Sequence, residues 1–174
     1  MLKLALVAVA VLNAGCGYAL DGRGNAVPSH IVRIGVPTFT NHSDTPELDR
    51  VLAEAVREEL RGRGRFTIVQ DSTGVDALLT ATVNPVSLTV AAQTDNRQAQ
   101  RYLMTVTATV EFKDMKDNKV LWSNPSVRVS EEYDAAVGVS VTNPAAIFTQ
   151  DQNALSRLAK SFARTLVTSI LTAF

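Results

Sequence analysis

Cys16 is the only cysteine in the chain, and it directly follows the small residues Ala14 and Gly15. A thiol in this setting can take up a diacylglyceryl group as a thioether, the modification made at the cysteine of a bacterial lipobox. Upstream of it, Lys3 and an apolar run over residues 4–12 follow the order of a secretory signal. The pattern predicts a lipoprotein signal peptide over residues 1–15 and a lipidated N-terminus at Cys16.

Two other interpretations of this segment fit the sequence less well. A transmembrane helix needs about 20 apolar residues, whereas polar Asn13 and the glycine-rich residues 15–24 end this run early. A free buried cysteine usually sits inside an element, whereas Cys16 lies between two glycines. Asn13 also departs from the Leu, Val or Ile that is usual at its position in a lipobox. Gly17, where enteric sorting rules use Asp for inner-membrane retention, favours the periplasmic face of the outer membrane.

Length and charge limit the class of protein and the domain organisation that the sequence allows. The chain has 174 residues, with 17 basic and 17 acidic side chains and no net charge, which argues against a nucleic-acid binder. Residues 16–28 are polar and glycine-rich and predict a flexible lipidated tether. Residues 29–174 are expected to form one domain, which at this size can bury enough surface to fold without disulfides.

No group of residues in the sequence indicates an enzyme or a bound cofactor. His30 and His42 lie in turn-like segments, with no second cysteine or His-x-Glu spacing that would suggest a metal site. The sequence also lacks a Gly-x-Ser-x-Gly motif and a phosphate-binding loop. We therefore expect a binding or assembly protein that acts without catalysis and without a cofactor.

Two segments have apolar residues at helical spacing. One stripe runs from Leu48 to Leu60, and a second runs from Leu155 to Phe174. The charges of the first helix, among them Glu54 and Arg57, are interpreted as its solvated side. On the last helix, which Pro144 is expected to open, three basic residues lie on one outer face, as a solvated stripe or as a contact for an anionic surface: Arg157, Lys160 and Arg164.

Five segments predict strands, namely residues 31–39, 66–69, 76–90, 102–112 and 120–133. Residues 102–112 alternate most clearly, with apolar side chains on one side and mostly threonine on the other. This pattern is typical of an antiparallel sheet that is covered on one side only. The predicted fold is an α/β (α+β) sandwich, with two helices packed on one face of a mostly antiparallel four- to five-stranded sheet.

The chain resembles the LptE family of lipopolysaccharide-assembly lipoproteins. The resemblance rests on the order of the elements and on Cys16-Gly17-Tyr18, Val36-Pro37 with Asn41, the threonine-alternating strand and Val120-Leu121-Trp122. It covers nearly all of the chain after the signal peptide. It implies an outer-membrane lipoprotein that plugs and assists the β-barrel LptD and binds lipopolysaccharide during insertion into the outer leaflet.

The resemblance also implies where lipopolysaccharide is bound. In the family, basic loop residues at one end of the sheet are the proposed contacts, and here the loop before Tyr102 carries Arg97 and Arg101. Arginine can bind phosphate through paired, charge-assisted hydrogen bonds. Lys116 and Lys119 belong to the next loop along the sheet, which antiparallel pairing is expected to place at the opposite end.

A second interpretation comes from another class of protein. Some outer-membrane lipoproteins with a small α/β domain activate a peptidoglycan synthase across the periplasm. Such proteins generally need a long disordered linker, whereas residues 17–28 span at most about 40 Å when fully extended. This short tether favours the barrel plug. A generic secreted ligand-binding module also remains compatible with the sequence.

Overall fold

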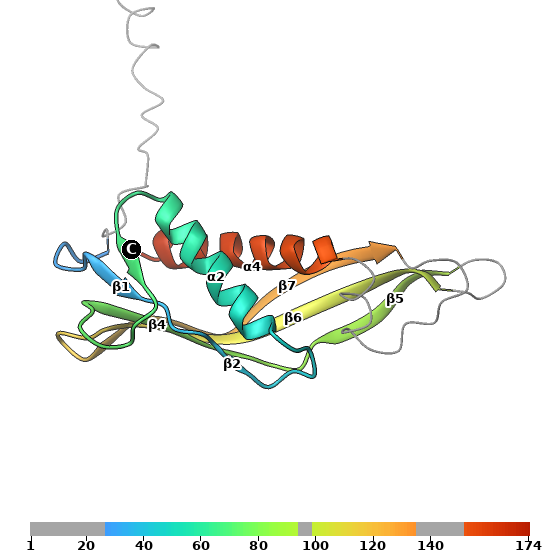
Figure 1. Ribbon diagram of the computed structural model, residues 1–174, viewed down its shortest axis with the longest axis horizontal. Helices are drawn as coiled ribbons and strands as arrows, with labels where there is room; N and C mark the ends of the chain where they lie inside the picture. The colour runs from blue at the N-terminus through green and yellow to red at the C-terminus, as the bar shows by residue number, and fades with distance from the viewer. Residues whose placement is uncertain (1–26, 94–98, 135–151) are drawn as a thin grey trace, which may run out of the picture.

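The computed structural model describes residues 27–93, 99–134 and 152–174. This part contains two helices and one seven-stranded sheet. The strands are β1 (Arg33–Gly35), β2 (Thr40–Asn41), β3 (Thr67–Val69), β4 (Ala77–Val83), β5 (Ser87–Gln93), β6 (Ala99–Asp114) and β7 (Lys119–Asp134), and the helices are α2 (Leu48–Gly62) and α4 (Gln152–Thr172). Figure 1 shows both helices on the same side of the sheet. The predicted α+β sandwich is confirmed.

The main part of the sheet is antiparallel and is formed by β6, with β7 along one edge and β4 and β5 along the other. β6 and β7 make a hairpin whose register runs from Arg101 opposite Asp134 to Asp114 opposite Lys119. Along the other edge of β6, β4 and β5 pair one after the other. The sequence predicted them as one strand, and the two are separated at Pro85, which cannot donate a ladder hydrogen bond. The N–H of Asn84, which donates to the carbonyl of Thr107 at 2.9 Å, keeps the ladder together across this interruption.

The N-terminal strands add a parallel part to the sheet. β1 pairs in parallel with both β3 and β4, and β2 pairs in parallel with β4. The parallel direction follows from α2, because a helical crossover returns the chain to the sheet in the same direction. The segment predicted as one strand over residues 31–39 is therefore two short strands, β1 and β2. These divisions give seven strands, where four to five were expected, and a mixed sheet.

The core lies between the sheet and the two helices. Alternate residues of β6 from Tyr102 to Phe112 are at most 5% exposed and face the helices. Leu52 and Val56 of α2 and Phe162 and Leu166 of α4 are fully buried against them. The period of two in the strand and the helical stripes thus both identified core residues correctly. In the described part, no helix is long and apolar enough to cross a membrane.

The charged side of α2 was predicted wrongly at one residue. The side chain of Arg57 is only 3% exposed, whereas Glu54 and Arg61 are about half exposed. The Arg57 guanidinium donates to the carbonyl oxygen of Val36 at 2.9 Å and to Glu54 at 2.6 Å. It thereby supplies a donor to a carbonyl just beyond the end of β1. Arg57 ties the helix to the sheet and does not belong to the solvated side.

The side of the sheet that faces away from the helices is rich in hydroxyl groups. We call its central part the hydroxyl face, and it consists of Thr80, Thr82, Thr105, Thr107, Thr109 and Ser130. These residues alternate with buried ones along β4, β6 and β7, so they point away from the core. Neither α2 nor α4 lies on this side (Figure 1).

Candidate functional site

Arg101, one of the two predicted ligand residues, lies near the start of β6 on the helix-free side of the sheet. The hairpin register brings it opposite Asp134 of β7 and diagonally next to Glu132. Its Nε donates to Asp134 at 3.0 Å and its Nη1 to Glu132 at 3.4 Å, while its side chain is 49% exposed. The hydrogen bond to Asp134 and the negative charges of both carboxylates raise the pKa of the guanidinium. Arg101 therefore stays charged at any physiological pH.

The other predicted site residues are not placed by the structure. Arg97 and Cys16 lie outside the described residues. The described part of the loop end thus contains one arginine and two carboxylates, so a phosphate that binds Arg101 must compete with Asp134 and Glu132. Exposed ion pairs contribute little in water, which means that this competition does not prevent the arginine from exchanging partners. The sequence did not indicate these two acidic neighbours, because their proximity depends on the hairpin register.

The two lysines of the β6–β7 turn lie at the opposite end of the sheet. Lys119 is paired with Asp114 at the turn, whereas Arg101 is paired with Asp134 at the other end of the same hairpin. Lys116 belongs to the same turn. The expectation that Lys116 and Lys119 do not share a site with Arg101 is confirmed.

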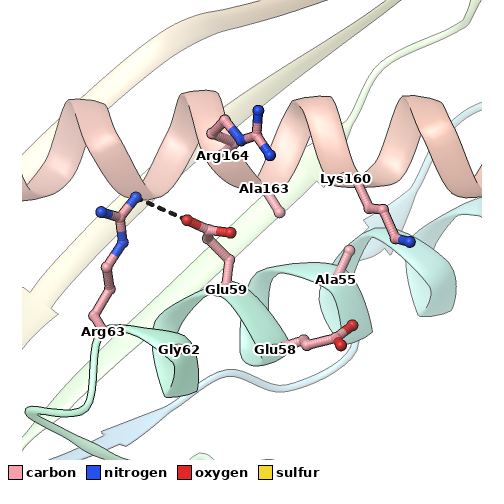
Figure 2. A pocket seen from close by; sticks show the side chains of 8 residues that line it. All are labelled: Ala55, Glu58, Glu59, Gly62, Arg63, Lys160, Ala163 and Arg164. Atoms are coloured by element: carbon pink, nitrogen blue, oxygen red, sulfur yellow. Dashed lines mark hydrogen bonds and ion pairs between the residues drawn. The ribbon is translucent and has the colours of Figure 1, made fainter.

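A groove of about 420 Å³ lies between the outer sides of α2 and α4 (Figure 2). Ala55 and Ala163 point into it, and Arg63 forms an ion pair with Glu59 at 2.7 Å on one wall. A second groove of about 300 Å³ lies along the same two helices. Small side chains at the contact let the helices approach, and charged side chains of both signs line the rim. This mixture of charges indicates no single class of ligand.

In the structure, the three residues of the predicted basic stripe of α4 have different surroundings. Arg157 stacks over the ring of Tyr133, with its guanidinium carbon 5.6 Å from the ring centre. Lys160 and Arg164 border the groove, and within the described residues neither forms an ion pair. Glu58 and Glu59 of α2 line the same groove. Their charges weaken the positive potential of the stripe, so the solvated interpretation describes it better than a contact with an anionic surface.

His30 is brought close to two acidic residues of the β6–β7 turn, a proximity that the sequence did not indicate. Its Nε2 lies 2.7 Å from Oδ2 of Asp114, which is buried, and Asp117 is adjacent. The other oxygen of Asp114 accepts the N–H groups of Lys116 and Asp117. Burial opposes ionisation of Asp114, but the hydrogen bonds from Asp117, His30 and Lys116 outweigh it and lower its pKa. The contact between His30 and Asp114 joins the N-terminal segment to the β6–β7 turn.

Comparison with known proteins agrees with this fold. The family model described as LptE, Lipopolysaccharide-assembly, matches residues 31–170, a range that includes every strand and nearly all of α4. A comparison with curated protein sequences finds no significant match.

Several solved structures are similar to the chain. Lipoprotein B from Nitrosomonas europaea aligns with a TM-score of 0.50 at 7% identity, covering 85% of this chain and 90% of that one. Rare lipoprotein B from Shewanella oneidensis gives a TM-score of 0.46 at 11% identity, with coverages of 79% and 95%. PelC from Paraburkholderia phytofirmans, which forms a dodecamer, gives 0.47 at 19% identity, with coverages of 86% and 95%. Since the family model spans most of the sequence, the chain belongs to the LptE family of lipopolysaccharide-assembly proteins.

Proposed function

We propose that the protein is an outer-membrane lipoprotein that plugs and assists an LptD-type β-barrel and binds lipopolysaccharide during its insertion into the outer leaflet. The observation that carries the proposal is the LptE family match over residues 31–170. The role requires no catalysis and no cofactor. In this proposal the lipid on Cys16 holds the protein at the periplasmic face of the membrane.

The attachment of the N-terminal segment supports this arrangement. Val27, which is buried, accepts a hydrogen bond from Arg65 through its carbonyl oxygen at 3.0 Å, and His30 is bound to Asp114. Val27 and His30 thus both contact the rest of the described domain. From Cys16 to Val27 the chain can extend by at most about 40 Å. A lipid anchor at Cys16 would keep the domain close to the membrane, as a barrel plug requires.

Co-purification tests the partnership with the barrel. The full-length protein, tagged at its C-terminus and extracted with detergent from the outer membrane of its own cells, is expected to bring down one large β-barrel protein in about equal amount. Mass spectrometry of the recovered proteins identifies the partner. Recovery of a peptidoglycan synthase instead of a barrel would assign the protein to the second class considered from the sequence.

Arg97 and Arg101 remain the proposed contacts for the phosphates of lipopolysaccharide. Replacing both by Glu is expected to weaken binding of purified lipopolysaccharide on the order of tenfold, because two phosphate-binding charges are lost and reversed. The remaining binding should depend more strongly on divalent cations, which can bridge carboxylates and phosphates. The melting temperature should change little, because exposed side chains contribute little to stability.

The matched control for this double variant lies at the other end of the sheet. Replacing Lys116 and Lys119 by Glu makes the same change in charge and should leave lipopolysaccharide binding nearly unaltered. Equal binding by the folded Arg97→Glu, Arg101→Glu variant and the wild type would remove the loop end as the ligand site. Loss of barrel association in that variant would instead assign the loop to the interface with the barrel.

A further inference from the structure

Three of the six hydroxyl groups of the hydroxyl face form hydrogen bonds within the sheet. Thr105 and Ser130 are hydrogen-bonded to each other across β6 and β7 at 2.7 Å, and Thr109 donates to the carbonyl oxygen of Pro125 at 3.0 Å. A polar group that already has a partner costs less to remove from water than one that must give up its hydration. These three residues can therefore be covered by another protein at low cost, although they are polar.

Most charged side chains on this side of the sheet lie toward its two ends, and Arg128, opposite Thr107, is an exception. Arg101 lies with Glu132 and Asp134 at the loop end, and Glu111 and Lys113 lie toward the turn. Between these ends, Arg128 is the one ionisable side chain that the described strands place on this side. Protein interfaces show the same distribution, since charged residues are depleted at their centre and gather at their rim.

The shape of the hydroxyl face suits a second sheet. Two sheets that stack face to face lie about 10 Å apart, a spacing that short side chains such as Thr and Ser permit. From Arg101 to Lys113 the helix-free side is about 40 Å long, and three strands give it a width of about 14 Å. The resulting area of roughly 600 Å² is about three quarters of one partner's share of a standard interface.

We propose that the hydroxyl face is the surface with which the domain packs against the inner wall of its β-barrel partner. This inference rests on the proposed function and adds to it which side of the plug meets the wall. The wall of a transmembrane barrel is itself a sheet, and its inner side is polar, so it matches the hydroxyl face in both shape and chemistry. Anionic lipid would need more cations than Arg128, and three of the six hydroxyls are already bonded within the sheet and are less available to a glycan.

Site-specific photo-crosslinking in cells tests the assignment. A photoreactive amino acid replaces Thr109, at the exposed centre of the hydroxyl face, or Glu58, on the exposed side of α2 in the groove, in the full-length lipoprotein. Position 109 is expected to give an adduct with the barrel in much higher yield than position 58. Equal yields, or a higher yield at position 58, would overturn the assignment, as would an adduct at position 109 that carries lipopolysaccharide in place of protein.

A charge placed on the hydroxyl face supplies a second readout. Thr109→Glu is expected to reduce recovery of the barrel by about tenfold or more, because it buries an unpaired carboxylate in the interface. Thr109→Ser keeps the hydroxyl and should recover the barrel like the wild type, and Glu58→Lys should do the same. Melting temperatures establish that each variant is folded. Normal recovery with folded Thr109→Glu would overturn this inference alone, whereas failure of the wild type to recover a barrel would overturn the proposed function with it.

Discussion

Replacement of Cys16 by Ala is expected to abolish lipidation of the protein completely. The thiol is the only one in the chain, so no other side chain can form the thioether. The intact mass of the wild type, extracted from membranes, should correspond to a chain that begins at residue 16 and carries a diacylglyceryl group. The variant should show no such adduct. Two acyl chains provide stable anchoring because each buried CH₂ contributes about 0.8 kcal/mol.

The matched control for this variant concerns the residue that departs from the lipobox pattern. Asn13→Leu introduces the usual residue and leaves Cys16 in place, so its mass should again show the diacylglyceryl group. A mature wild-type protein that begins elsewhere and has an unmodified thiol at residue 16 would contradict the signal peptide and the anchor together.

The parts of the fold that were predicted correctly depend on local patterns. The alternation along β6 and the stripes of α2 and α4 repeat with the period of one element, so the sequence around each residue determines which side is buried. The split of residues 31–39 into β1 and β2 could not be predicted in this way. Their parallel pairing with β4 depends on the crossover through α2, and therefore on contacts between segments far apart in the chain.

The candidate ligand site, too, could be predicted only in part from the sequence. The sequence identified Arg101 as a basic residue in a polar segment, but its two ion-pair partners lie more than 30 residues later in the chain. Which side chains of β7 reach Arg101 depends on the hairpin register, which shifts near Asn124 and Pro125. Pro125 lies within the predicted strand over residues 120–133, but the size of a register shift cannot be inferred from residue type. The ionic surroundings of Arg101 therefore required the structure.

Arg57 and Arg61 demonstrate how little residue type says about burial on a charged helix. Each has a glutamate three residues before it, so both fit the pattern of exposed pairs on a solvated side. In the structure Arg57 is buried and bonded to the Val36 carbonyl, 21 residues away in sequence, whereas Arg61 is 48% exposed and lies 3.8 Å from Glu54. The difference in burial arises because the Arg57 side chain points toward the end of β1 and the Arg61 side chain does not.

Arg57→Ala is accordingly expected to lower the free energy of unfolding by about 2–3 kcal/mol. It removes the packing of the aliphatic stem and leaves a buried carbonyl without its charged donor. Glu54 loses its partner too, but it is half exposed and can be hydrated. For a domain of this size the loss corresponds to a fall of roughly 4–12 °C in the melting temperature. Calorimetry or denaturant unfolding of the domain measures it directly.

Two further variants separate the hydrogen bonds of Arg57 from its packing. Arg57→Met keeps most of the aliphatic volume and loses the donors, so its stability should lie between those of the wild type and Arg57→Ala. Arg61→Ala removes an arginine from the same helix and the same pairing pattern, and its effect should stay within about 0.5 kcal/mol. Similar losses in Arg57→Ala and Arg61→Ala would mean that Arg57 contributes as a surface charge only. A larger loss confined to position 57 would establish that the guanidinium joins α2 to the end of β1.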